Sequence, residues 1–158
     1  MTRARQFFRA VFAKITKEDR EYIKKYLNDN GQRLFFEMAI FDQAHAIMVA
    51  KTIETFDYEG NRDFLARIAL LHDVGRRGVS VFDKVFCVLI NAVSKKLAKT
   101  LSKYFHSLHI YYNHPQIGAE LLKNVGFTRE AEIILHHHEN MKNPPRELVL
   151  LQKADELN

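Results

Sequence analysis

The stretch LLHDVGR, residues 70–76, best indicates the fold of this chain. It closes a segment in which Leu65, Ile68 and His72 recur at the spacing of one helical face. Two nearby glycines follow and end the helix. We therefore predict a helix over about residues 62–73 that carries His72 on its apolar side.

Apolar residues at helical spacing recur along the rest of the chain, and we find no strand-like alternation, internal repeat or linker. We predict an all-α fold, a single-domain helical bundle whose functional centre lies in the core. A domain at residues 34–158 would carry an N-terminal helical segment, residues 1–33, packed on it. The other expected helices run from a capping box at 16–19 to about 30–31, from 34 to 56, from 81 to 101, from 114 to 126, from 128 to 138, and from 144–145 to the C-terminus.

The predictions of two of these helices depend on specific sequence patterns. The helix that starts at His114-Pro115 follows a less regular stretch, 106–113, and places proline at its favoured first position. The helix over 81–101 is read as amphipathic, with a lysine stripe on a solvated face opposite its apolar residues. The lysines are Lys95, Lys99 and Lys103, with Lys96 beside them, and the apolar residues are Val81, Val85, Val88, Leu89, Val93, Leu97 and Leu101.

Composition excludes several classes of protein. A chain of 158 residues with 47% hydrophobic and 27% charged residues is globular and not disordered. Its single cysteine, Cys87, excludes an intrachain disulfide and a cysteine-rich zinc site, and it fits a reducing compartment. No run reaches the roughly 18 apolar residues that span a bilayer, and the apolar part of the N-terminus is too short for a secretory signal. We expect a cytoplasmic protein.

The formal net charge of +5 suggests an anionic partner. The basic, amphipathic segment from Arg3 to Lys14 could contact an anionic membrane or a partner protein, but we favour its packing on its own domain. We expect no nucleic-acid partner. The sequence does not indicate the oligomeric state.

Histidines and aspartates occupy the inward stripes of five predicted helices. A lone histidine on an apolar face is more often a satisfied core residue. Five such helices together favour one shared metal centre, because buried ionisable groups are costly unless they are paired or coordinate a metal. Nitrogen and oxygen ligands without thiolate suit iron, manganese, zinc, nickel or cobalt. The residues on these stripes are His45, His72, His114, His137, His138 and Asp155.

These residues resemble the H…HD…D signature of the HD-domain metal-dependent phosphohydrolases. Residues 70–76 are similar to that family's helix-ending H-D-I-G-K segment, 114–120 to the H-P-x-x-G-A stretch of a subgroup with an extended metal site, and 137–139 to the H-H-E of that subgroup. The resemblance covers about residues 41–158. It implies a first divalent metal held by His45, His72, Asp73 and Asp155, and a second held by Asp73 as a bridge with His114, His137 and His138.

The resemblance implies an enzyme that cleaves a phosphate monoester or diester of a phosphorylated small molecule, a nucleotide, by metal-activated hydroxide. Asp73 and Arg76 would be catalytic, and Arg76 and Arg77 would bind the substrate phosphate. The G-Y-P motif of the cyclic-dinucleotide phosphodiesterases is missing after residue 139, which argues against that substrate. The alternative is a non-catalytic nucleotide-sensing or signalling module that retains the metal site.

Overall fold

A computed structural model describes residues 14–158, and within that range the chain is helical with no strand. This confirms the predicted all-α class. The elements are α2 (Lys17–Tyr26), α3 (Asp29–Phe36), α4 (Ile40–Ile53), α5 (Arg62–Leu71), the short 3-10 helix η1 (Val74–Arg76), α6 (Val81–Val93), α7 (Lys95–Leu101), α8 (His106–Asn124), α9 (Thr128–Leu135) and α10 (Arg146–Leu157).

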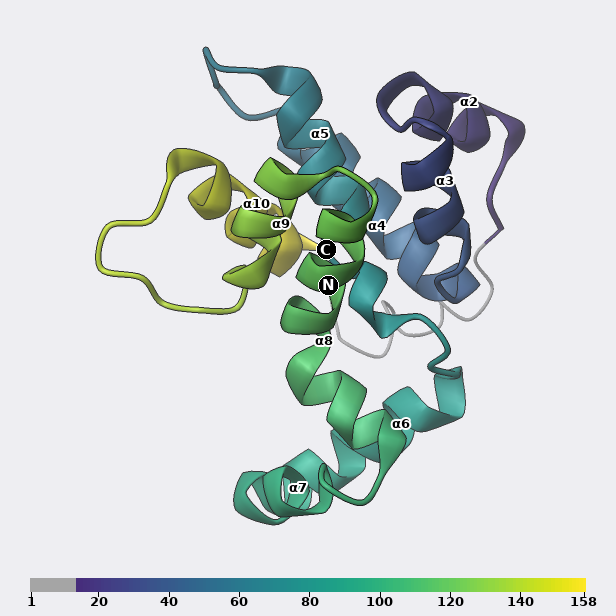
Figure 1. Cartoon of the computed structure of the whole chain (residues 1–158), viewed down its shortest axis with the longest axis vertical. Coiled ribbons are helices and arrows are strands. Elements are labelled where there is room, and N and C mark those ends of the chain that lie inside the picture. Colours follow the sequence, from purple (N-terminus) through teal and green to yellow (C-terminus); the bar gives the residue numbers. More distant parts are fainter. Residues whose placement is uncertain (1–13) are drawn as a thin grey trace.

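Helix α5 is the centre of the main body. Seven of its ten residues are buried, as expected of a helix that is apolar on nearly every side. Helices α2, α3, α4, α9 and α10 all pack against it, and the second half of α8 packs against α9 and η1. In Figure 1 these helices gather in the upper part of the molecule, while α6 and α7 lie at its lower end and α8 joins the two regions.

The N-terminal helices share the core of the main body. Thr16 caps α2 through the predicted capping box with Asp19. Helix α2 ends earlier than predicted, because the extended Leu27 and the side chain of Asn28, which accepts a hydrogen bond from the Gly31 N–H, start a separate helix. Ile23 and Leu27 are buried in the same cluster as α5. Residues 1–13, which include most of the basic amphipathic segment, lie outside the described range.

Two further predicted helices were wrong in their extent. The predicted helix over 34–56 is interrupted at residues 37–39, and α4 starts afresh after the extended Ala39. The predicted helix over 81–101 is broken at Ser94, whose backbone is extended and whose side chain caps α7. Serine competes for backbone hydrogen bonds in this way, which favours a cap over a helix interior.

The apolar face predicted for 81–101 is not buried. Val88, Leu89 and Val93 of that face are 55%, 60% and 77% exposed. Phe82, which was not part of the predicted face, is 86% exposed. Only a small separate core, made by Cys87, Ala98 and Leu108, lies between α6, α7 and α8. Within residues 14–158, no helix is both long and apolar enough to cross a membrane.

Helix α8 also differs from the prediction. It starts at His106 and not at His114, so Pro115 lies inside the helix and not at its first turn. An interior proline removes a helical hydrogen bond and leaves the carbonyl four residues earlier without its usual donor. That carbonyl belongs to Tyr111, and it accepts a hydrogen bond from Nδ1 of His114 instead, at 3.0 Å.

Candidate metal centre

The side chains predicted as metal ligands come together in the middle of the main body. They fall into two groups, each of which has ligand atoms within 4.8 Å of one another. Each group draws on several elements, so only the folded bundle can assemble it. The first group is His45, His72 and Asp155, and the second is Asp73, His114, His137 and His138.

In the first group, His45 on α4 contacts Asp155 on α10, with Nε2 2.8 Å from Oδ1. His72, at the end of α5, places its Nε2 3.7 Å from the same oxygen and 3.6 Å from Oδ2 of Asp73. Asp73 therefore lies against both groups. This is the position that a bridging carboxylate would need.

In the second group, Oδ1 of Asp73 faces histidines from two different parts of the chain. It lies 3.4 Å from Nε2 of His114 on α8 and 3.9 Å from Nε2 of His137, which follows α9. His138 completes the group, with its Nε2 3.1 Å from that of His114. One ligand atom from each of the three histidines and from Asp73 therefore lies within 4.8 Å of the others.

The same kind of local hydrogen bond orients three of the histidines. Nδ1 of His72, His114 and His137 lies 2.8, 3.0 and 2.6 Å from the carbonyl oxygen three residues earlier in the chain. A neutral imidazole that donates through Nδ1 keeps the lone pair of Nε2 free, and in each case Nε2 points into the cluster. The Ala69 and Ile134 carbonyls lie in the last turn of their helices, and the Ile134 carbonyl also accepts a hydrogen bond from the His137 N–H. The Tyr111 carbonyl lacks its usual helical donor because Pro115 has no N–H.

A close backbone crossing brings α8 against the His-Asp pair. A Cβ atom built on Gly75 would lie 2.0 Å from the carbonyl oxygen of His114 and 2.8 Å from the amide nitrogen of Gly118. Only glycine at position 75 allows η1 to lie this close to α8. The glycines of the two motifs therefore hold His114 beside Asp73.

Burial and charge set the protonation of the cluster. Burial alone would raise the pKa of Asp73, but the Arg76 guanidinium, 3.2 Å from its carboxylate, opposes burial, and that pKa lies well below the usual range. Burial, reinforced by Arg76, lowers the pKa of His114 to about 3. Burial also lowers the pKa of His137 well below its ordinary value and lowers that of His138. At neutral pH these three histidines are neutral and Asp73 is ionised, which are the forms that bind metal.

The cluster contains polar atoms that nothing in the described chain satisfies. Nε2 of His72, Nε2 of His137 and Oδ1 of Asp73 are all buried without a hydrogen-bond partner. Such atoms are costly to bury, and each of these is a metal-binding atom directed at its neighbours. The residues therefore fit divalent metal ions, with two carboxylates and five imidazoles as the donor set.

Arg76 belongs to a buried charge network next to the second group. Its Nε lies 3.2 Å from Oδ1 of Asp73, and its Nη2 lies 3.4 Å from Nε2 of His114. Behind it, Nη1 lies 3.9 Å from Asp42, whose carboxylate accepts a hydrogen bond from Lys84 at 3.0 Å. Burial raises the pKa of Asp42 despite these two cations.

Asp42 and Lys84 were not among the residues predicted for the site. An acidic residue in the first turn of a helix ordinarily complements the helix dipole, and Asp42 occupies such a position on α4. No local signal separates that role from a buried one. Its partner Lys84 is 42 residues away, so only the fold connects them.

Arg77 and three of the eight histidines lie outside the cluster. Arg77, predicted to bind substrate, donates a hydrogen bond to Glu37 at 2.8 Å and does not line the cavity next to the second group. His136 contacts Glu139 at 2.7 Å on the surface. His106 and His109, for which no role was assigned, are both exposed on the first turns of α8.

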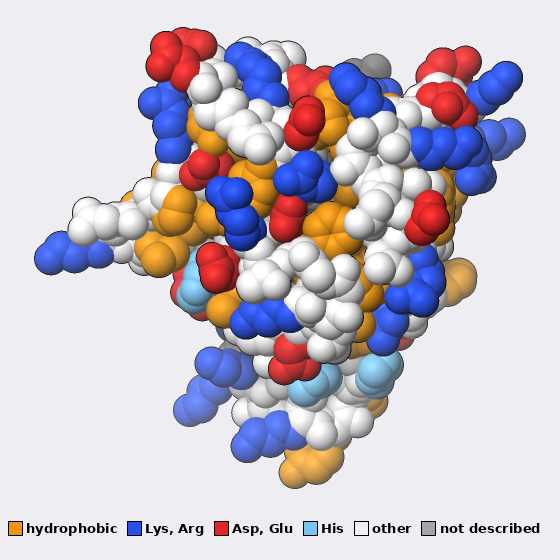
Figure 2. Space-filling model, turned by 45° about the horizontal axis from the view of Figure 1, so that its top comes forward, with side chains coloured by type: hydrophobic (Ala, Val, Ile, Leu, Met, Phe, Trp, Pro, Cys, Tyr) orange, Lys and Arg blue, Asp and Glu red, His pale blue; other side chains and the backbone are white. Residues whose placement is uncertain are grey.

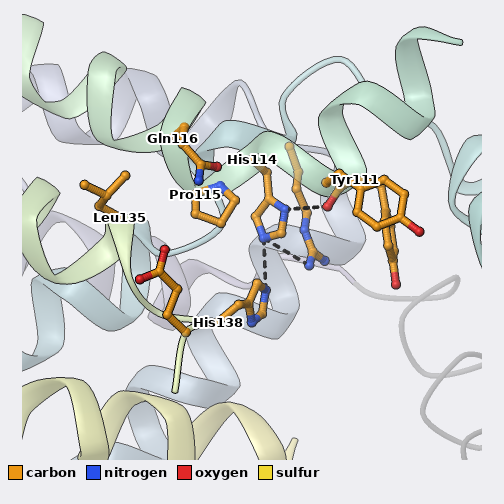
Figure 3. A pocket seen from close by; sticks show the side chains of 9 residues that line it. Tyr111, His114, Pro115, Gln116, Leu135 and His138 are labelled. Carbon is orange, nitrogen blue, oxygen red and sulfur yellow. Dashed lines mark hydrogen bonds between the residues drawn. The ribbon is translucent and has the colours of Figure 1, made fainter. Parts of the chain in front are cut away.

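A cavity of about 410 Å³ opens beside the second group. Residues of α8 and of the end of α9 form facing walls, and His114 and His138 lie between them (Figure 3). Arg76, which was predicted to bind the substrate, also lines this cavity. Tyr111, Tyr112 and Gln116 were not predicted, because surface aromatic and amide residues have no distinctive spacing. The residues that line the cavity are Arg76, Tyr111, Tyr112, His114, Pro115, Gln116, Leu135, His138 and Glu139.

Comparison with known proteins gives one match. The model of the HD domain family matches residues 43–158. No curated protein and no solved structure matches the chain. The matched segment starts two residues before His45 and contains all seven residues of the cluster.

Proposed function

The chain belongs to the HD domain family, and we propose that it is a metal-dependent phosphohydrolase. The observation that carries this proposal is the set of buried Nε2 and carboxylate atoms of His72, His137 and Asp73, which lack a hydrogen-bond partner and converge from separate elements. His45, His72, Asp73 and Asp155 would hold one divalent ion. Asp73, His114, His137 and His138 would hold a second.

A divalent metal at this site supplies a water of lowered pKa and polarises a phosphoryl oxygen. The chain's own residues bind and position the phosphate ester. Asp73 faces both groups and fixes their separation. The Arg76 guanidinium lies at the wall of the 410 Å³ cavity, where it can bind a phosphoryl oxygen and offset charge that develops there.

We further propose that the substrate is a nucleotide. The cavity volume falls within the roughly 300–1,000 Å³ that is usual for small-molecule sites. Tyr111 and Tyr112 line it next to Arg76, so one wall offers aromatic surface for a base and a cation for phosphate. Gln116 on the same helix adds an amide that can hydrogen-bond the edge of a base.

The test is a comparison of two adjacent histidines. His137→Ala removes a buried ligand, whereas His136→Ala removes a surface neighbour whose side chain contacts Glu139. After anaerobic purification, metal content and phosphate release from a nucleotide panel are measured for both. Loss of metal and of activity in the first variant alone is expected. The proposal fails if the metal-loaded wild-type protein cleaves no nucleotide or aryl phosphate, or if both variants keep full metal content.

A second candidate is a module that binds a nucleotide without cleaving it. The contacts of Arg76 with Asp73 and His114 favour this candidate. The guanidinium already places a positive charge beside the ligands of the second group, where it would compete with a second metal ion. This candidate predicts a stable complex with intact nucleotide and no product after hours of incubation. Release of phosphate under those conditions would exclude it.

A further inference from the structure

Helix α6 is apolar on nearly all of its sides but is covered on one side only. Cys87, Phe86 and Ile90 pack toward the small core shared with α7 and α8. At 100° per residue, the exposed residues Phe82, Val85, Val88, Leu89, Ala92 and Val93 occupy an arc of roughly 140° that contains no charged side chain. A helix that is apolar all round is normally buried, so a second partner is expected for this face.

The charge of the chain is concentrated in the same region. We call residues 79–105, which comprise α6, α7 and their flanking turns, the α6–α7 lobe. It contains five lysines and one aspartate, a formal charge of +4. The remaining described residues, 14–78 and 106–158, contain 16 basic and 18 acidic residues, a formal charge of −2. The body of the molecule is therefore slightly acidic, and the lobe is strongly basic.

The lysines of α7 follow directly on the apolar face of α6. In residues 14–158, Lys84 pairs with Asp42, but none of the four lysines at 95, 96, 99 and 103 pairs with a carboxylate. The exposed Tyr104 and Phe105 follow them. At the lower end of the molecule in Figure 2, basic side chains (blue) lie next to hydrophobic ones (orange).

We propose that the α6–α7 lobe docks on the surface of an anionic lipid membrane, with the exposed face of α6 in the headgroup region and the lysines of α7 on the lipid phosphates. An amphipathic surface of this kind binds in the plane of the interface without spanning the bilayer. Aromatic residues such as Phe82 and Tyr104 are suited to that interface, and lysine stems extend along it to reach the headgroups.

Charge argues against the other occupants of this face. A second copy would bring two lobes of charge +4 together. Residues 1–13 of the same chain contain three arginines and no acidic residue, so they carry the same sign. A protein partner is less well matched, because every cation of the lobe is a lysine, and lysine is depleted at protein interfaces whereas arginine is enriched.

The experiment uses the full chain and co-sedimentation with vesicles of phosphatidylcholine alone or with 30% phosphatidylserine. Binding is expected to be at least tenfold tighter to the anionic vesicles. Replacing Lys95, Lys96 and Lys99 by Gln should weaken it about a hundredfold, since each lysine near the surface contributes about fivefold. The matched control replaces three exposed lysines of other elements, Lys24, Lys123 and Lys142, by Gln and should change binding less than fivefold.

A fluorescence reporter tests the face of α6 separately, because the chain has no tryptophan. Phe82→Trp should show a blue shift with anionic vesicles and quenching by brominated lipid. A tryptophan in place of Val149, which is exposed on α10, should show neither. The double variant Leu89→Ser with Val93→Ser should bind anionic vesicles roughly tenfold more weakly.

Three results would overturn the proposal. The first is the absence of binding to the anionic vesicles, and the second is equal binding by the triple Gln variant. The third is a dimer in light scattering that the Leu89→Ser and Val93→Ser changes convert to a monomer, because a second copy would then cover α6. None of these readouts depends on metal or activity, so the outcome is separate from that of the proposed phosphohydrolase function.

Discussion

Replacing Gly75 by alanine should disrupt the centre without touching a ligand. The added Cβ would lie 2.0 Å from the carbonyl oxygen of His114 and 2.8 Å from the amide nitrogen of Gly118. A carbon–oxygen contact closer than about 3.3 Å is unfavourable, so η1 and α8 must separate by more than about 1 Å. Both obstructing atoms belong to the backbone, so no side chain can rotate to relieve the clash.

Overpacking in a core typically costs 1–3 kcal/mol, and a backbone clash belongs at about 3 kcal/mol. For a chain of this size each kcal/mol lowers the Tm by roughly 2–4 °C, so calorimetry should give a decrease of about 6–12 °C. The separation also moves His114 away from Asp73, at present 3.4 Å apart. The metal content measured on the same sample should therefore fall from two ions per chain to one, because the second group is no longer assembled.

Gly78→Ala is the matched control. Gly78 has a φ of 77°, but a Cβ there would meet nothing within 4 Å. Its replacement should cost only the local strain of a left-handed residue, about 1–2 kcal/mol, and should leave metal content unchanged. If Gly75→Ala retained both the wild-type Tm and full metal content, the close crossing would not be what positions His114.

Three further predictions concern separate parts of the molecule. Added metal should slow amide exchange in the last turn of α10, because a metal held by Asp155 would tie that turn to His45 and His72; identical exchange with and without metal would contradict this. Tyr58→Phe should lower the free energy of unfolding by about 1 kcal/mol at neutral pH, because the Tyr58 hydroxyl donates a hydrogen bond to Glu147 at 2.5 Å and lowers the pKa of that carboxylate. In denaturant unfolding the difference between the two proteins should vanish as the pH falls and Glu147 is protonated. A difference that stays constant with pH would refute this. Pro115→Ala should leave the Tm unchanged or higher but weaken metal binding about tenfold in a titration. The reason is that the new N–H of residue 115 competes with His114 for the Tyr111 carbonyl. An unchanged metal affinity would refute this.

The sequence was sufficient to predict the helical class and to select the residues that cluster. His72 and Asp155 could be selected because helical spacing assigns a residue to a face from its immediate neighbours. The same local rule marked Thr16 as a helix start, which the structure bears out. Features that depend on four or five consecutive residues were therefore accessible from the amino-acid sequence alone.

Features that depend on distant residues were not accessible. The pattern of 81–101 was read as one helix with a core-facing side, but Ser94 breaks it and Phe82 and Val93 are exposed. An apolar stripe predicts that a surface will be covered, and it does not indicate by which partner. Asp42 was missed for the same reason, since only the fold brings Lys84 and Arg76 to it.

The residues next to the ligands explain why the longer motifs at 70–76 and 114–120 indicate a metal site, whereas a lone His-Asp pair does not. Pro115 leaves the Tyr111 carbonyl to His114, and this hydrogen bond holds the Nε2 lone pair of His114 toward the cluster. Gly75 and Gly118 let two backbones cross closely enough to place that Nε2 beside Asp73. None of these three residues has a side chain that could bind a metal. A chain that kept every ligand but lost Pro115, Gly75 and Gly118 could fail to assemble this centre. The presence of these three residues is therefore support for a metal site that is independent of the ligands themselves.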